Sequence, residues 1–239
     1  MARRASALFG CTWLRAALAA ALGSVGMMAQ EPSAPPVAAT VSPTNMPLRQ
    51  IAPGVFEIGK VRFDQQQKTV TFPAALNLSA GIIEYVLVTS YGKTHESLLR
   101  TEVEPYHIHL ALLLLGAKGA GTNAFPDDPA KPLPGDRVTV ELSWKKGRKE
   151  LRRRAEELVY SRRTRSPMTP GEWIYNGSQV LEGTFVAQRD GSIISLITDP
   201  DALVNNPRPG HQDDENWTVS KTGLPAPDTP VQVLLRLSR

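Results

Sequence analysis

The segment at residues 105–115 constrains the fold most, because a strong helix start there leads directly into an apolar run. Pro105 suits the first helical position, where its missing N–H is not needed, and Gly116 suits the residue that follows a helix. The segment is apolar on nearly every side, and a helix of that kind is normally surrounded by protein. The sequence therefore predicts one buried helix at 105–115.

Short strand-like segments make up most of the chain after residue 54. They are rich in β-branched and aromatic residues, and polar or glycine-containing turns separate them. The expected strands are 55–57, 60–63, 68–72, 82–89, 94–100, 137–144, 172–175, 184–188, 192–198 and 231–237. We predict an α+β domain, mainly an antiparallel β-sheet with the one buried helix and short additional helices.

Two hairpin turns and one helix cap follow from local residues. The turn at 90–93, which contains Gly92, is expected to fold 94–100 back against 82–89. Asp190-Gly191 is a typical hairpin dipeptide. Asp199 can cap a short helix that has Pro200 at its first position. The long loop at 116–136 is a candidate flap.

The N-terminal region predicts export. Arg3 and Arg4 precede an apolar stretch at 14–28, which together indicate a secretory signal peptide over residues 1–29. Residues 30–53 are rich in proline and alanine and predict a semi-extended linker, so residues 54–239 are expected to form a single domain. The protein would then be periplasmic or extracellular. A lipoprotein attached at Cys11 and a retained membrane anchor are the alternatives.

Removal of residues 1–29 would change both cysteine content and charge. It would remove the only cysteine, Cys11, and three arginines, lowering the net charge from +4 to about +1. A chain without cysteine has no thiol nucleophile, no cysteine-ligated iron–sulfur cluster and no covalent c-type haem. The near-neutral charge gives no reason to expect nucleic acid as a partner, and no later segment is long enough to span a membrane.

Three of the four histidines fall at 95–109 and form the main candidate site. His95 and Glu96 are neighbours on an expected strand, so they point to opposite faces, while His107 and His109 diverge on the helix. We expect His109 to lie near either His95 or Glu96 and to bind a ligand or metal ion or to transfer a proton. The alternative is that all are satisfied structural side chains, because zinc normally takes three protein ligands.

Two charged clusters supply further candidates. The loops at 199–206 and 213–216 contain carboxylates that suit calcium, without the spacing of an EF-hand: Asp199, Asp201, Asp213 and Asp214. Residues 145–165 contain ten Lys/Arg and three Glu, and could bind an anionic polymer. The candidates there are Arg152, Arg153, Arg154, Arg162 and Arg163. The same stretch could instead be a solvated face, or a helix in which glutamates pair with arginines.

Motifs of common enzyme classes are absent from the sequence, including the G-x-S-x-G elbow, H-E-x-x-H, the Walker loop and the dinucleotide fingerprint. In contrast, GKTHESLL at 92–99, IH at 108–109, WIYNGS at 173–178 and ENW at 215–217 resemble the YdjY-domain family. The resemblance covers roughly residues 50–238. It implies a secreted, mostly bacterial domain and supplies no catalytic residue. An iron–sulfur link that it would suggest does not fit a mature chain without cysteine.

These observations predict an exported, non-enzymatic ligand-binding or accessory domain of the cell envelope, with a pocket lined by residues 94–109. Its partner would be an unidentified envelope ligand or protein. No cofactor is predicted, although a transition metal or calcium stays open. The alternative is a metal-binding protein or metal-dependent enzyme that uses His95, Glu96 and His109. A structural protein that binds anionic polymer through 145–165 is a third hypothesis.

Overall fold

The computed structural model describes residues 46–121 and 123–238. The predicted signal peptide at 1–29, Cys11 and the linker up to residue 45 lie outside the described residues. Within the described part, 40% of the structure is strand and 11% is helical. The protein is therefore mostly β, and its pairing pattern defines the architecture.

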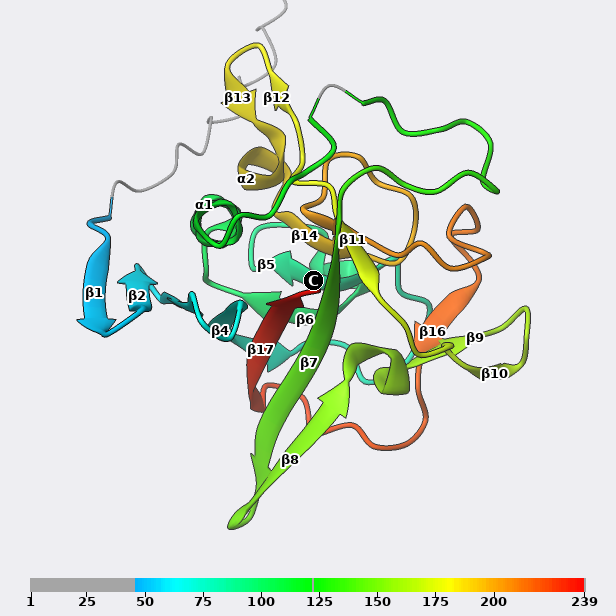
Figure 1. Ribbon diagram of the computed structural model, residues 1–239. Helices are drawn as coiled ribbons and strands as arrows, with labels where there is room; N and C mark the ends of the chain where they lie inside the picture. Colours follow the sequence, from blue (N-terminus) through cyan, green and yellow to red (C-terminus); the bar gives the residue numbers. More distant parts are fainter. Residues whose placement is uncertain (1–45, 122, 239) are drawn as a thin grey trace, which may run out of the picture. The chain divides into compact units, whose positions relative to one another are not determined.

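Eight strands of the largest sheet close into a barrel, because the last strand in the pairing order returns to the first (Figure 1). In spatial order they are β4 (Thr69–Leu76), β17 (Pro230–Leu237), β7 (Asp136–Lys146), β11 (Trp173–Tyr175), β15 (Val204–Asn205), β14 (Ser192–Ser195), β5 (Tyr85–Thr89) and β6 (Ser97–Thr101). Pairing of β6 with β4 completes the circle. Most pairs are antiparallel, whereas β5–β6 and β14–β15 are parallel.

The barrel interior is filled by alternate residues of these strands, as expected for a small barrel. On β7, Val138, Val140 and Leu142 are buried, while Arg137 is exposed. Val233 on β17 is fully buried beside them. The interior is therefore a packed core, and any binding site must lie outside it.

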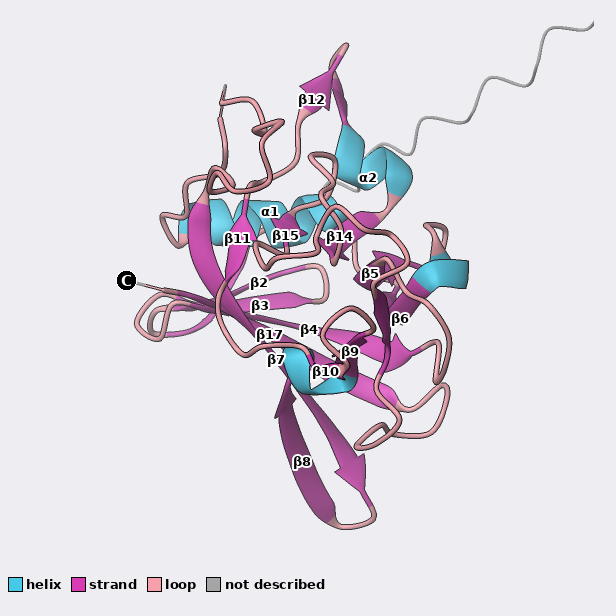
Figure 2. Ribbon diagram, turned by 90° about the vertical axis from the view of Figure 1, so that its right-hand side faces the viewer, coloured by secondary structure: helices cyan, strands magenta, loops and turns pink. Residues whose placement is uncertain are grey.

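Additional strands extend from the barrel. β1 (Arg49–Ala52), β2 (Val55–Ile58) and β3 (Val61–Asp64) continue the sheet from β4, and β1 falls inside the stretch predicted as linker. β8 (Lys149–Arg154) pairs with β7 in a hairpin that projects beyond the barrel (Figures 1 and 2). Two small sheets are formed by β10 (Ser166–Pro167), β9 (Val159–Ser161) and β16 (Trp217–Val219), and by β12 (Val180–Leu181) and β13 (Thr184–Phe185).

Helical structure is limited to short elements. α1 (Pro105–Leu114) begins at Pro105 as predicted and packs against β3 and β4. α2 (Val186–Asp190) contacts α1, and the two lie on the same side of the described unit (Figure 2). Two 3-10 turns, η1 (Thr94–Glu96) and η2 (Ala155–Leu158), complete the set within the described residues.

The predicted fold class is wrong, because the chain forms a closed β-barrel with two α-helices in its described part rather than an α+β sheet around a buried helix. The helix at 105–115 does form, but it is half-exposed. His107, Ile108 and Leu112 are buried on one side, while Leu113 and Leu114 face solvent. The helix therefore has one buried side and one exposed side although its sequence is apolar on both, and apolar side chains remain exposed.

The predicted hairpin of 82–89 with 94–100 is also wrong, since β5 and β6 run parallel with Tyr85 opposite Ser97. The chain turns after β5, forms η1 and returns to start β6 beside the start of β5. The Asp190-Gly191 dipeptide does not form a hairpin turn but ends helix α2. Gly191 adopts φ 73° and donates its N–H to the Ala187 carbonyl. The segment 184–188 is accordingly part strand and part helix.

The other strand predictions agree with the structure to within a few residues. Segments 55–57, 137–144 and 231–237 correspond to β2, β7 and β17. The expected helix at Asp199-Pro200 is a turn instead, in which the Asp199 carboxylate accepts from the Asp201 N–H. That turn lines one of the two cavities described next and bonds to residues that line the other.

Candidate functional site

Two buried asparagines, Asn205 and Asn176, hold the turn at 199–203 in place through hydrogen bonds. Asn205 accepts the Asp199 N–H (2.8 Å) and donates to the Asp199 carbonyl (2.7 Å) and to the Asn176 side chain (2.8 Å). Asn176 in turn donates to the Ala202 carbonyl (2.8 Å). β15 and the residues after β11 thereby set the position of the turn.

One cavity adjoining this turn has a volume of about 550 Å³, and we refer to it as the Lys93 pocket. Its main polar and aromatic lining consists of Tyr85, Tyr91, Lys93, Arg189, Asp199 and Asp201. Tyr85 comes from β5, Lys93 from the residue before η1, and Arg189 from α2. The parallel β5–β6 connection is what brings Lys93 back over the Tyr85 ring, 5.0 Å from its centroid.

A chain of three side chains crosses the Lys93 pocket. The Lys93 ammonium donates to the Tyr85 hydroxyl (3.0 Å), and the Tyr85 hydroxyl donates to Oδ2 of Asp199 (2.9 Å). Burial, followed by the Asp199 charge, raises the pKa of Tyr85, so its hydroxyl stays protonated. Burial also raises the pKa of Asp199, while the bonds from Asp201 and Tyr85 oppose that shift.

His95 and Glu96 lie at one edge of this region, on η1. The His95 side chain is 78% exposed and its Nε2 is 3.6 Å from Glu96 Oε2. Glu96 also lies 3.6 Å from the Lys93 ammonium. His95 lines the Lys93 pocket, whereas Glu96 pairs with the Lys93 ammonium. The two residues contact each other because a 3-10 turn replaces the strand on which they would have diverged.

His109 lies elsewhere, on α1, beside a second cavity of about 560 Å³ that we call the His109 cavity. Its lining includes His109, Leu113, Gly177, Gln179, Val180 and Phe185. The His109 Nδ1 bonds to the Tyr175 hydroxyl (2.8 Å), and burial lowers the pKa of His109 to about 4. His107, the third histidine of the cluster, is buried on the other face of the helix.

The structure therefore assigns the predicted site residues to two cavities. His95 lines the Lys93 pocket and His109 lines the other, and no contact joins them among the described residues. No group of three or more histidine, cysteine, aspartate or glutamate side chains in the described part of the chain could hold a metal ion. A metal site formed by His95, Glu96 and His109 stays a prediction without support from this geometry.

The calcium candidates are divided in the same way. Asp199 and Asp201 both line the Lys93 pocket, and Asp201 also accepts from the Gln179 side chain. Asp213 lies in the loop before β16, where its carboxylate accepts the Glu215 N–H, and Asp214 lines a different hollow near His211. The two pairs of aspartates thus serve separate places in the fold.

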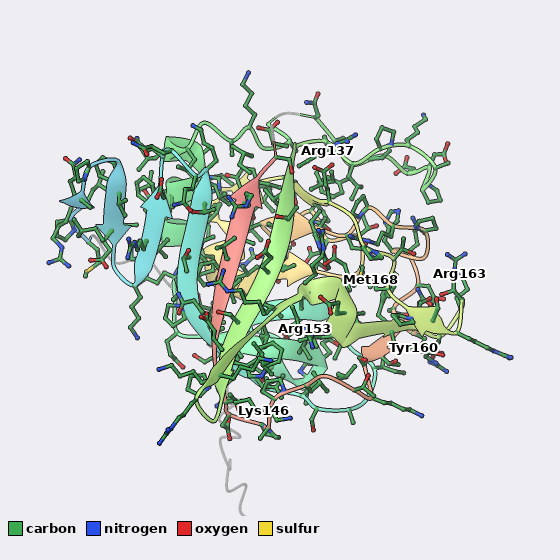
Figure 3. All side chains as sticks on the ribbon, turned by 60° about the horizontal axis from the view of Figure 1, so that its bottom comes forward. Arg137, Lys146, Arg153, Tyr160, Arg163 and Met168 are labelled. Carbon is green, nitrogen blue, oxygen red and sulfur yellow. The ribbon has the colours of Figure 1, made fainter. Side chains whose placement is uncertain are left out.

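The five candidate arginines of the basic segment mostly have acidic partners. Arg152, Arg153 and Arg162 pair with Glu150, Glu157 and Glu215 at 3.4–3.7 Å. Figure 3 shows Arg153 and Arg163 at separate places along the segment, on either side of Tyr160. The Arg163 backbone N–H donates to the Asn216 side chain. These arginines are therefore spread over several elements.

Arg154 belongs to a buried ion network. Glu156, which is fully buried, accepts from Arg154 (3.0 Å) and from Arg208 (2.8 Å), and Arg208 stacks 4.9 Å from the Trp173 ring. Burial lowers the pKa of Arg208 to about 10. This network joins η2 to the barrel and serves stability. By contrast, Lys145, Lys146, Arg148 and Lys149 at the tip of the β7–β8 hairpin are exposed and make no ion pair within the described residues.

Several residues of the two cavities were not identified from the sequence. Lys93, Tyr175 and Gln179 fall within or beside the motifs that carry the family resemblance, so the signal was present without an assigned role. Arg189 and Phe185 were not identified, because 184–188 was predicted as a strand that leads into a hairpin turn at Asp190-Gly191. Helix α2 is what directs the first toward the Lys93 pocket and leaves the second beside His109.

Within residues 46–121 and 123–238, no helix has the length and apolar character needed to cross a bilayer. Comparison of the chain with the curated proteins and with the solved structures gave no match. The family model described as the YdjY domain matches residues 61–236. This match runs from the start of β3 to one residue before the end of β17, so it includes the barrel strands and the lining residues of both cavities. The chain therefore belongs to the YdjY-domain family.

Proposed function

We propose that this chain is an exported, non-enzymatic domain of the cell envelope that binds a small hydroxyl-rich molecule, such as a saccharide unit, in the Lys93 pocket. The observation that carries the proposal is the spare hydrogen-bonding capacity of Lys93 and Asp199 at the wall of an open cavity. An ammonium has three donors and a carboxylate about four acceptor positions. Lys93 uses one donor on Tyr85, and each Asp199 oxygen accepts one bond.

A ligand hydroxyl matches this pair because it donates and accepts at once. Such a group could donate to Asp199 and accept from Lys93. An isolated cation or anion would be opposed by one of the two charges, since Asp199 and Lys93 lie on either side of the same tyrosine hydroxyl.

Size and aromatic lining support the same ligand class. A cavity of about 550 Å³ is in the range of small-molecule sites. Tyr91 lines it with a side chain that is 47% exposed, and its hydroxyl donates to the Gln188 carbonyl, which holds the ring in place. An exposed and positioned aromatic ring is a suitable surface for the apolar face of a sugar.

The protonation states favour binding over proton transfer. Tyr85 keeps its proton because burial raises its pKa, so it acts as a donor and not as a general base. Its role is to hold Asp199 and Lys93 at a fixed separation. The pocket is thereby organised for hydrogen bonding to a ligand.

Titration of the chain with glucose, N-acetylglucosamine and a muramidase digest of peptidoglycan tests this function. We expect saturable binding by calorimetry with at least one of them, weakened about tenfold or more by Asp199→Asn, which removes the charge from an acceptor. Asp127→Asn, an exposed aspartate of the 116–136 loop, is the matched control and should bind as the parent does. Failure of all three probes, or equal loss in both variants, would contradict the proposal.

Export and metal content are tested on the same protein. N-terminal sequencing of protein recovered from an expressing bacterium is expected to start near residue 30 in the periplasmic or medium fraction. An intact N-terminus in the cytosolic fraction would contradict export.

Elemental analysis of the purified protein tests the metal-binding alternative. A stoichiometric transition metal that disappears in both His95→Ala and His109→Ala would favour that alternative over the function proposed.

A further inference from the structure

The His109 cavity differs in kind from the Lys93 pocket. None of the described residues that line it carries a charged side chain. Leu113, Val180 and Phe185 supply apolar walls, and its volume of about 560 Å³ suits a small molecule. The cavity is therefore open to a ligand without charge.

Part of the lining of this cavity consists of exposed apolar side chains. Leu113 is 44% exposed and Val180 is 65% exposed, and both line the cavity. Leu181 next to Val180 is also exposed. Exposed apolar side chains that gather at a cavity, rather than being scattered singly, indicate a binding surface.

The His109 ring lines this cavity, and the position of its proton can be assigned. The buried Tyr175 hydroxyl bonds to Nδ1 of His109 and has no other acceptor among the described residues, so we assign it as the donor, which leaves the proton of the neutral ring on Nε2. Nε2 has no hydrogen-bond partner within the described residues, yet it is not among the polar atoms closed off from solvent. His109 thus presents an N–H donor without a partner beside the apolar side chains of Leu113, Val180 and Phe185. The other polar side chains of the lining each bond to another residue: Asn123, Asn176, Ser178 and Gln179.

Neighbouring groups hold the imidazole in this orientation. The Phe185 ring lies 4.8 Å from the His109 ring, centroid to centroid. Gly177 adopts φ 81°, and a Cβ there would come within 3.3 Å of the His109 Cε1 and of the Tyr175 hydroxyl. Glycine at this position therefore leaves room for the His109–Tyr175 pair.

We propose that the His109 cavity is a second binding site, which takes an uncharged, mainly apolar small molecule through a hydrogen bond from His109 Nε2–H to a carbonyl or ether oxygen. The ligand's apolar body lies against Leu113, Val180 and Phe185. This site is independent of the proposed saccharide pocket, with which it shares no lining residue.

Prodan, an uncharged naphthyl ketone whose emission reports both polarity and hydrogen bonding, is a suitable probe. We expect saturable one-to-one binding with blue-shifted emission. His109→Phe keeps an aromatic ring but removes the donor, and should weaken binding about five- to tenfold. The anionic 1-anilinonaphthalene-8-sulfonate should bind less tightly, because no cation lines the described part of the cavity.

A pair of surface variants provides the matched control. Leu113→Glu places a charge at the cavity mouth and should reduce prodan affinity at least tenfold, whereas Ile82→Glu, at an equally exposed position (44%) outside the cavity, should leave it unchanged. Binding that is insensitive to both His109→Phe and Leu113→Glu would overturn the proposal. Equal losses in Leu113→Glu and Ile82→Glu, or tighter binding of the sulfonate, would also overturn it.

Discussion

The Lys93 pocket and the His109 cavity have similar volumes, yet their linings differ in charge. The turn at 199–203 lines the first and bonds to residues that line the second. In each, a buried tyrosine hydroxyl bonds to a titratable group: Tyr85 to Asp199 and Tyr175 to His109. Around Asp199 a lysine is close, and the pocket is lined by charged groups of both signs. Around His109 no charge is near, and the imidazole is neutral. The comparison shows that a buried tyrosine hydroxyl can belong to a charged or to an uncharged environment, depending on the residues around it.

The largest effect is expected from removing the Asn205 hydrogen bonds that hold the turn at 199–203. Asn205→Leu would leave the Asp199 N–H, the Asp199 carbonyl and the Asn176 side chain without their partner. Three unsatisfied buried groups should lower the free energy of unfolding by about 3 to 5 kcal/mol, measured by urea denaturation. Binding at both cavities should weaken as the turn loses its position.

Asn206→Leu is the matched control, because Asn206 is equally buried and bonds to the Leu196 carbonyl and to Arg208. It should cost a comparable free energy while both cavities keep their ligands in the folded protein. If Asn206→Leu disturbs binding as much as Asn205→Leu does, the position of the turn is not what supports binding at the two cavities.

An intermediate effect is expected from the protonation of His109 as the pH falls. The pKa of its imidazole is about 6.5 when unfolded and about 4 when folded, so the unfolded chain binds the extra proton between these values. This contribution to stability is fully present above pH 6.5 and is lost as pH falls towards 4, by up to about 3 kcal/mol. Burial raises the pKa of Asp199 and Glu84, which act in the opposite direction.

Comparison of the parent with His109→Gln isolates this term, because the other groups titrate in both proteins. The difference in unfolding free energy, measured by urea denaturation from pH 7.5 to 4, should shrink as the pH falls. A difference that stays constant over this range would mean that the His109 ring is solvated when folded.

The smallest effects should distinguish the two tyrosines. Tyr175→Phe removes one hydrogen bond to a neutral ring and should cost about 1 kcal/mol. Tyr85→Phe removes a hydrogen bond to a carboxylate and should cost about 2 kcal/mol. It should also raise the pKa of Asp199 further, since the Tyr85 hydroxyl lowers it, and carbon-13 NMR of the carboxyl group can measure this. Equal costs, or an unchanged Asp199 pKa, would remove the electrostatic distinction between the sites.

The sequence predicted elements better than their arrangement. Alternation on β7 and the Pro105 start of α1 are local signals, and both agree with the structure. Gly92 was interpreted as a hairpin turn, but it packs against the carbonyls of Asp190 and Gly191, where a Cβ would approach within 3.1 to 3.2 Å. The turn is thus shaped by a segment about a hundred residues away, which periodicity does not report.

Prediction of the candidate site from the sequence was limited in the same way. His95 and His109 were each recognised as unusual, and each lines a cavity. The residues that complete these places come from distant strands and turns: Tyr85 and Asp199, which line the pocket with His95, and Tyr175, which bonds to His109. Barrel closure by β4 and β6 pairs residues that no local pattern links. Chemistry-bearing positions could be found from the sequence, whereas their grouping required the three-dimensional pairing.

The same closure has a consequence for how the molecule opens. β4 pairs with β17 from Ala75 to Thr69, but with β6 only at Ala75–Arg100 and Leu76–Leu99. The Asn77 side chain supplements this seam by donating to the carbonyls of Thr94 (2.6 Å) and Ser97 (2.8 Å). Partial unfolding favours the part of a structure with the fewest hydrogen bonds to break. We expect amide hydrogen exchange in β6 to begin at its short pairing with β4. Exchange in the long pairings of β17 with β4 and β7 should be much slower.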